Sequence, residues 1–166
     1  PYPFETAALA QAAEMLNGPE TLLLLGGTAL TESNLETAGR IAGKTGCKLL
    51  SEWSNARLER GAGRVSVNRV PYPIDMALEV LAPFKRIVLI GARAPIGFFA
   101  YPGKPAILTR EGADIVTLAD AGADLSLVLQ RTSVQEFAAL AGAPAGGNGL
   151  APIALPESVN GDFHVI

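Results

Sequence analysis

The chain has 166 residues, a formal net charge of -3 and an apolar content of 49%, which fits one domain with a full hydrophobic core. Its 13 Lys and Arg residues are spread along the chain, so no nucleic-acid partner is expected. One cysteine and one histidine exclude an intrachain disulfide and a metal centre built from those two residue types. No apolar run has the length of a membrane span, and we expect a cytoplasmic protein without a membrane partner.

The first half of the chain predicts a β-α-β unit. Residues 6–16 carry apolar side chains at helical spacing, and the leucine-rich run Thr21–Leu25 predicts a strand that is buried on both faces. Residues 33–36 have the pattern of a capping box, which predicts the start of a second helix. A short strand over residues 47–50 completes the unit, and such a crossover implies parallel strands.

The middle of the chain predicts a second group of strands. Residues 54–72 are rich in glycine and arginine and predict a long irregular connection, followed by a short helix over residues 75–81. The apolar run Arg86–Ile90 predicts another fully buried strand, and residues 105–108 and 114–118 predict two more.

The last part of the chain predicts helices and then a linker. Apolar residues at helical spacing follow Asp124, which is expected to cap a helix, and a second capping box at residues 133–136 predicts a separate helix. Residues 143–166 are interpreted as a linker toward a missing C-terminal domain, which leaves residues 1–142 as one domain of a longer protein. The fold class predicted is α/β: a three-layer, Rossmann-like parallel sheet of about five or six strands with helices on both faces.

Two of the predicted strands end in glycine, and these ends are the candidate ligand site. In an open α/β sheet, ligands bind outside the carboxyl ends of the strands, where glycine lets the backbone approach them. The candidate cofactor-binding residues are Gly26, Gly27 and Thr28 after the first strand, and Gly91, Ala92 and Arg93 after the later one. Arg93 suits a phosphate, but a structural ion pair is an equal alternative, and a tight turn alone also explains Gly26 and Gly27.

Residues 98–105 place three aromatic side chains around Pro102-Gly103, a pair that predicts a type II turn. We expect this loop to contact a neighbouring domain, because it carries so much apolar surface. The alternatives are a lid over a planar ring and a loop that packs its aromatics into its own core. No set of nucleophile, general base and orienting group is present, so no catalytic and no metal-binding residue is predicted.

The order of these elements, with Gly26-Gly27 after the first strand and Gly91-Ala92-Arg93-Ala94-Pro95 after the later one, resembles a known family. It is similar to the central domain of thiamine diphosphate-dependent enzymes, above all the acetolactate synthase large-subunit group. The resemblance covers roughly residues 5–142. It implies a parent enzyme that joins or cleaves 2-oxo acids, with thiamine diphosphate and Mg²⁺ bound by flanking domains outside this chain, and it implies a homo-oligomer.

The same resemblance implies FAD, ADP or no nucleotide at this domain, and it adds residues 51–53 to the loops that touch such a nucleotide. Residues 61–69 lack the histidine-containing glycine stretch that contacts the flavin in true acetolactate synthases. Two functions of different class therefore remain open. One is a domain that supports cofactor binding and domain assembly in the parent, and the other is a non-catalytic scaffold or oligomerisation domain without a nucleotide. On either interpretation the chain alone is expected to be inactive.

Overall fold

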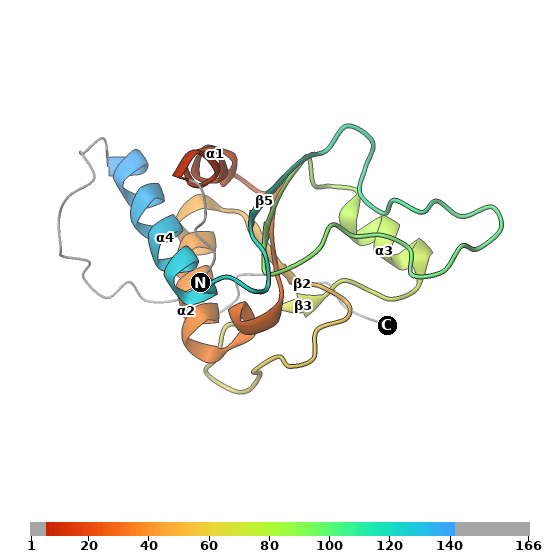
Figure 1. The fold of residues 1–166 in the computed structure, drawn as a ribbon, viewed down its shortest axis with the longest axis horizontal. Coiled ribbons are helices and arrows are strands. Elements are labelled where there is room, and N and C mark those ends of the chain that lie inside the picture. Colours follow the sequence, from red (N-terminus) through yellow and green to blue (C-terminus); the bar gives the residue numbers. More distant parts are fainter. Residues whose placement is uncertain (1–5, 142–166) are drawn as a thin grey trace.

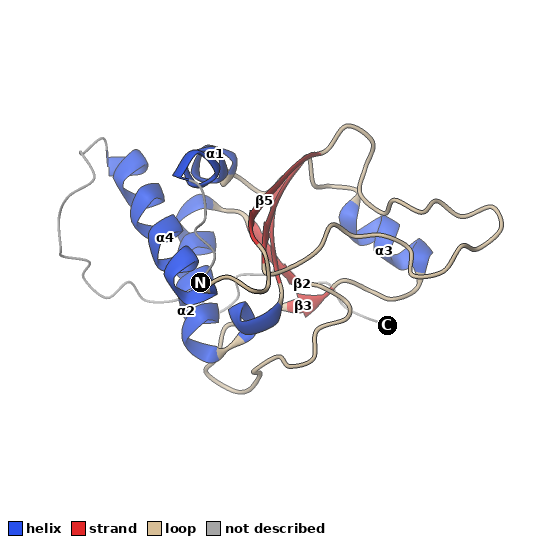
Figure 2. Ribbon diagram, viewed as in Figure 1, coloured by secondary structure: helices blue, strands red, loops and turns tan. Residues whose placement is uncertain are grey.

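The computed structural model describes residues 6–141, which form a five-stranded parallel sheet with helices on both faces (Figures 1 and 2). The order of the strands across the sheet is β3-β2-β1-β4-β5. The predicted fold class is therefore confirmed. In chain order the elements are α1 (Thr6–Met15), β1 (Thr21–Leu25), the 3-10 turn η1 (Gly27–Leu30), α2 (Glu32–Thr45), β2 (Lys48–Ser51), β3 (Asn68–Arg69), α3 (Ile74–Leu81), β4 (Arg86–Ile90), β5 (Asp114–Ala119) and α4 (Leu125–Ala141).

Strands β1 and β4 form the centre of the sheet, and both were predicted from their apolar runs. They pair in parallel from Thr21 opposite Arg86 to Leu25 opposite Ile90. All five residues of β1 are buried, because each of its faces is covered by a separate layer. This double burial explains why the run shows no polar alternation.

The two faces of the sheet are covered differently. Figure 1 shows α1, α2 and α4 on one side, and α3 with the segment between β4 and β5 on the other. Leu23 and Leu25 belong to the buried cluster of the first side, whereas Leu22 and Leu24 belong to the cluster formed with α3. Alternate residues of one strand therefore reach separate cores, as the pleat of a strand requires.

One predicted strand is absent from the sheet, and the structure contains a different one. Residues 105–108 lie on an extended hairpin-like segment, in which Ile96 and Ile107 form an isolated antiparallel bridge. Two backbone bonds flank this bridge, from the amide of Gly97 to the carbonyl of Ala106 at 2.7 Å and from Leu108 to Pro95 at 3.2 Å. We call residues 95–108 the arm. The prediction was wrong because most of this apolar run is not buried: residues 105–107 are exposed, Ile107 to 67%, and only Leu108 reaches the core.

The strand that the sequence did not predict is β3, which lies inside the supposedly irregular connection. It has only two residues, both polar, and it pairs with the end of β2 at the edge of the sheet. Such a short polar strand carries no hydrophobic period that would reveal it.

Both predicted capping boxes are wrong, whereas the Asp124 cap is confirmed. Helix α2 starts at Glu32 after Thr31, so Ser33 lies inside the first turn. Helix α4 runs without a break through Ser133, because its buried face continues past Val128 and Leu129. The Asp124 carboxylate accepts the amide of Leu127 at 3.1 Å. The proposed linker, residues 143–166, lies outside the described residues.

Candidate functional site

The two predicted glycine turns meet at the carboxyl ends of β1 and β4. The amide of Gly26 donates to Ile90 at 3.0 Å, and the amide of Gly91 donates to Ala119 at 2.8 Å. A Cβ atom on Gly26 would lie less than 3.0 Å from the Gly91 carbonyl, and one on Gly91 would lie equally close to Gly26 and to the side chain of Leu125. Gly91 also has a φ of 67°. The absence of a side chain at Gly26 and Gly91 therefore lets the backbones of these two turns lie in close contact. The amides of both glycines already donate to backbone carbonyls of the sheet.

A cavity of about 370 Å³ lies next to this glycine pair, and we call it the crevice. Its lining includes Leu24 and Val70, which belong to the core shared with α3, so the crevice opens on the α3 side of the sheet. The chain moves from β1 toward β2 in one direction and from β4 toward β5 in the other. The crevice is thus at the topological switch point, where open α/β sheets bind their ligands.

The crevice contains one acidic and one basic side chain. Glu52 follows β2 and is half-buried, and its Oε2 accepts the amide of Arg93 at 3.4 Å. The Arg93 guanidinium makes no hydrogen bond or ion pair with any residue that the structure describes, which removes the predicted ion-pair alternative for these residues. A carboxylate and a guanidinium that is paired with none of the described residues therefore share one concave surface.

The six predicted cofactor-binding residues do not converge on that surface. Arg93 lines the crevice, whereas Gly26 and Gly91 contact each other and Ala92 is buried in the core beside α3. Gly27 lies on the opposite side, where a Cβ atom would meet Ala121 and Leu125 at 3.7 Å.

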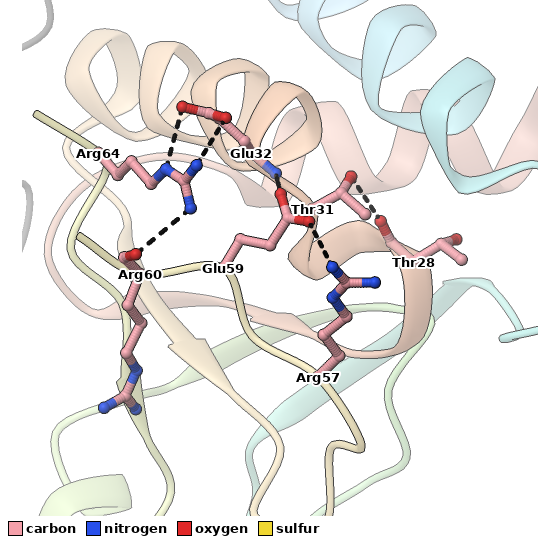
Figure 3. A network of polar contacts seen from close by, with 7 residues as sticks. All are labelled: Thr28, Thr31, Glu32, Arg57, Glu59, Arg60 and Arg64. Atoms are coloured by element: carbon pink, nitrogen blue, oxygen red, sulfur yellow. Dashed lines mark hydrogen bonds and ion pairs between the residues drawn. The ribbon is translucent and has the colours of Figure 1, made fainter.

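The carbonyl of Thr28 and the first amide of the adjacent helix are also engaged within the protein. The Thr28 carbonyl accepts the Asn34 side-chain amide at 2.8 Å and the Thr31 hydroxyl at 3.1 Å. The first amide of α2, that of Glu32, donates to the Glu59 carboxylate at 2.5 Å (Figure 3). A protein carboxylate therefore occupies the place where a helix N-terminus would hold a phosphate.

The loop that carries Glu59 is held by further charged contacts. Arg64 donates two hydrogen bonds of 3.0 Å to the carboxylate of Glu32, and its third nitrogen reaches the Arg60 carbonyl at 3.3 Å (Figure 3). Arg57 lies 3.7 Å from the Glu59 carboxylate. The glycine- and arginine-rich segment is irregular, but these contacts tie it to α2.

The resemblance placed residues 51–53 among the loops that touch a nucleotide, but the sequence did not single out Glu52 as a charged group of the site. Its signal is positional: it is an acidic residue directly after the second strand, where many nucleotide-binding folds place the group that binds ribose hydroxyls. Trp53, which follows it, lines the same crevice and is half-buried.

Trp53 also begins a chain of aromatic side chains that leads onto the arm. Ring centroids are 5.1 Å apart between Trp53 and Phe98, 4.7 Å between Phe98 and Phe99, and 6.1 Å between Phe99 and Tyr101. The three arm aromatics are between 46% and 61% exposed, so they do not pack into a core of the described chain. The predicted type II turn is confirmed by a φ of 73° at Gly103 and by the bond from the amide of Lys104 to Tyr101 at 3.1 Å.

No protein-family model matches the chain. The chain is 36% identical over 155 residues to the Mycobacterium tuberculosis (strain ATCC 25618 / H37Rv) protein named "Putative acetolactate synthase large subunit IlvX". This match covers 92% of the chain and 28% of the relative. A solved structure titled "X-ray structure of a putative thiamin diphosphate-dependent enzyme isolated from Mycobacterium smegmatis" has the same fold over 90% of this chain and 30% of its own. The TM-score is 0.57 at 18% identity.

In sequence the chain is similar to part of a protein named as an acetolactate synthase large subunit, and in fold it is similar to part of a thiamine diphosphate-dependent enzyme. The predicted resemblance to the middle domain of such an enzyme is confirmed. It spans less than a third of the length of either of these relatives.

Proposed function

We propose that the chain is the central domain of a thiamine diphosphate-dependent enzyme that joins or cleaves 2-oxo acids, and that it supports cofactor binding and domain assembly there. The observation that carries this proposal is the 36% identity over 92% of the chain to a protein named as an acetolactate synthase large subunit. We place the parent enzyme in the cytoplasm and expect it to be a homo-oligomer. Size-exclusion chromatography of the purified parent tests the oligomer.

The chemistry of the parent is proposed to lie outside this chain. Among the described residues no group of three or more His, Cys, Asp or Glu side chains could hold a metal ion, and no described helix is long and apolar enough to cross a membrane. When bound, thiamine diphosphate supplies carbanion stabilisation. The chain incubated with pyruvate, thiamine diphosphate and Mg²⁺ should form no acetolactate, and turnover above background would contradict this assignment.

At the crevice, we propose a nucleotide-type ligand such as FAD or ADP. Glu52 suits ribose hydroxyls, Arg93 suits one phosphate, and Trp53 and Phe98 offer ring faces or edges to a planar base. The residues do not fit a nucleotide whose phosphates rest on Gly26, Gly27 and Thr28, because Glu59 occupies the helix start and the Gly26 amide is paired. We therefore propose that the ligand binds on the α3 side of the sheet.

Calorimetric titration of the chain with ADP and with FAD tests the ligand proposal. Arg93→Gln and Glu52→Gln should each weaken binding about tenfold, since each removes a charged hydrogen-bond partner. Arg57→Gln is the matched control, because this arginine is also exposed but lies outside the crevice. A Gly91 variant is a poor probe, since a Cβ atom there overlaps Leu125 and Gly26 whether or not a ligand binds.

The scaffold function remains the second candidate, and one specific observation favours it. Both glycine amides at the strand ends are bonded within the sheet, so the geometry of the turns explains these glycines without a ligand. If neither ADP nor FAD produces heat with the wild-type chain, the scaffold function is preferred.

Domain assembly is assigned to the arm. Ile96, Phe98, Phe99 and Ile107 are each more than half exposed, and they project from one hairpin-like segment. Contiguous apolar surface of this kind is typical of a docking site. We propose that it contacts one of the flanking domains of the parent.

A further inference from the structure

The arm is both an exposed element and a wall of the crevice. Residues 93–98 line the crevice, and Phe98 also lines a second cavity of about 310 Å³ that lies between the arm and the start of α3. Phe98 is thus the side chain that separates the two spaces. Its ring meets Trp53 edge-on, with centroids 5.1 Å apart. Where Phe98 lies therefore determines how open the crevice is on this side.

The tip of the arm is tied to the start of α3 by an ion pair. Nζ of Lys104 lies 2.6 and 2.7 Å from the two carboxylate oxygens of Asp75, in the first turn of α3. Tyr101 and Tyr72, which lies two residues before that helix, line the same cavity between the arm and α3. The type II turn sets Tyr101 and Lys104 on either side of Pro102-Gly103, so one turn brings both residues to α3.

We propose that Lys104 and Asp75 are positioning residues of the crevice: their ion pair holds the arm so that Phe98 lies against Trp53 and closes one side of the crevice. An exposed ion pair contributes little by itself. Here the ion pair of Lys104 and Asp75 holds one end of the segment that carries Phe98, and the bridge between Ile96 and Ile107 holds the other end. Loss of the ion pair therefore frees this segment. The ligand part of this inference rests on the proposed nucleotide site, whereas the positioning of Phe98 does not.

The test uses Trp53, the single tryptophan of the chain, whose quenching by acrylamide reports how well the ring is covered. Lys104→Met should raise the quenching constant, because losing an exposed ion pair shifts the equilibrium between the held and the released arm by about two- to fivefold. Lys104→Arg keeps the charge and should restore the wild-type value. Lys85→Met is the matched control, because Lys85 forms an exposed ion pair with Glu20 at 2.7 Å away from the arm.

A Phe98→Ala background shows whether Lys104 acts through Phe98. Phe98→Ala should raise the quenching by itself, and adding Lys104→Met should then change it no further. Unchanged quenching in Lys104→Met, or a full additional increase in the Phe98→Ala background, would overturn the inference. ADP is the ligand probe: if the wild type binds it, Lys104→Met should weaken that binding. If neither ADP nor FAD binds, the proposed ligand fails, and the quenching results still decide the role of Lys104.

Discussion

The two faces of the sheet differ in how completely they are covered. On one face, α1, α2 and α4 close a continuous core, and side chains such as Leu35 and Ile41 are at most 1% exposed. On the other face, α3 has only eight residues and the arm covers the rest. Seven large apolar side chains on that face are more than 40% exposed: Tyr72, Met76, Ile96, Phe98, Phe99, Tyr101 and Ile107.

The cause of this difference is the handedness of the connections. Crossovers between parallel strands are right-handed, so connections that run in opposite directions across the sheet lie on opposite faces. The path from β1 to β2 places α2 on one face, and the paths from β3 to β4 and from β4 to β5 place α3 and the arm on the other. Stability is therefore concentrated on the helix-rich face, and the crevice and the exposed aromatics lie on the thinly covered one.

The largest contrast is expected from truncating one aliphatic side chain on each face. Leu35→Ala removes a buried side chain from α2 and should lower the free energy of unfolding by about 3 kcal/mol. Ile107→Ala shortens a side chain that is 67% exposed and should change it by less than about 0.5 kcal/mol. Urea unfolding of the chain measures both. Equal losses would mean that the arm belongs to the core, and the contrast between the faces would be wrong.

A smaller contrast separates two glycines with similar backbone angles. Gly91 and Gly103 have φ values of 67° and 73°, so alanine at either position costs about 1 kcal/mol in backbone strain. At Gly103 no heavy atom lies within 4 Å of the added Cβ, whereas at Gly91 the Cβ overlaps Leu125 and Gly26. Gly91→Ala should therefore destabilise the chain by about 2 kcal/mol more than Gly103→Ala. Similar unfolding free energies for the two variants would show that the sheet end yields to the extra atom.

The glycines that follow β1 and β4, Gly26 and Gly91, show which features of the fold can be predicted from the sequence and which cannot. An apolar run that stops at glycine predicts a central strand and its end, and β1 and β4 were found where their leucine- and isoleucine-rich runs place them. The same pattern does not tell whether the glycine faces a ligand or another backbone. That depends on the neighbouring strand, which comes about sixty residues later in the chain.

The missed features have the same physical origin. Strand β3 is a polar pair at an edge, and residues 105–107 are apolar but exposed on the arm, so local hydrophobicity misleads at both places. The predicted cofactor-binding residues are separated in the structure, because the loops that carry them leave neighbouring strands toward opposite faces of the sheet. Glu52 and Arg93 meet on the α3 side, whereas Gly27 and Thr28 turn toward α2 and α4. Only the topology determines that division.

The next prediction concerns the exposed arm. Truncating Phe98 and Phe99 together to Ala in this chain should cost about 1 kcal/mol or less, because both rings are more than half exposed. In the parent enzyme each ring that is buried against a flanking domain should cost on the order of 3 kcal/mol. Unfolding of the chain and thermal inactivation of the parent measure the two effects. Equal destabilisation would show that the arm packs only on its own domain.

The smallest expected effect concerns Tyr72 and Tyr101, which line the cavity between the arm and the start of α3. The hydrogen bond with Tyr101 raises the pKa of Tyr72 above its ordinary value of 10.0. The folded chain thus holds this phenol proton more tightly than the unfolded chain does. The resulting stabilisation is present below pH 10.0 and is lost as the pH rises through the raised pKa of the folded state.

Tyr101→Phe should lower the pKa of Tyr72 toward 10.0. Titration of the tyrosinate absorbance measures this pKa, and Tyr72→Phe identifies which part of the signal belongs to Tyr72. If Tyr72 titrates at the same pH in Tyr101→Phe as in the wild type, the two hydroxyls are not bonded in solution. The arm would then be tied to α3 by the ion pair of Lys104 and Asp75 alone.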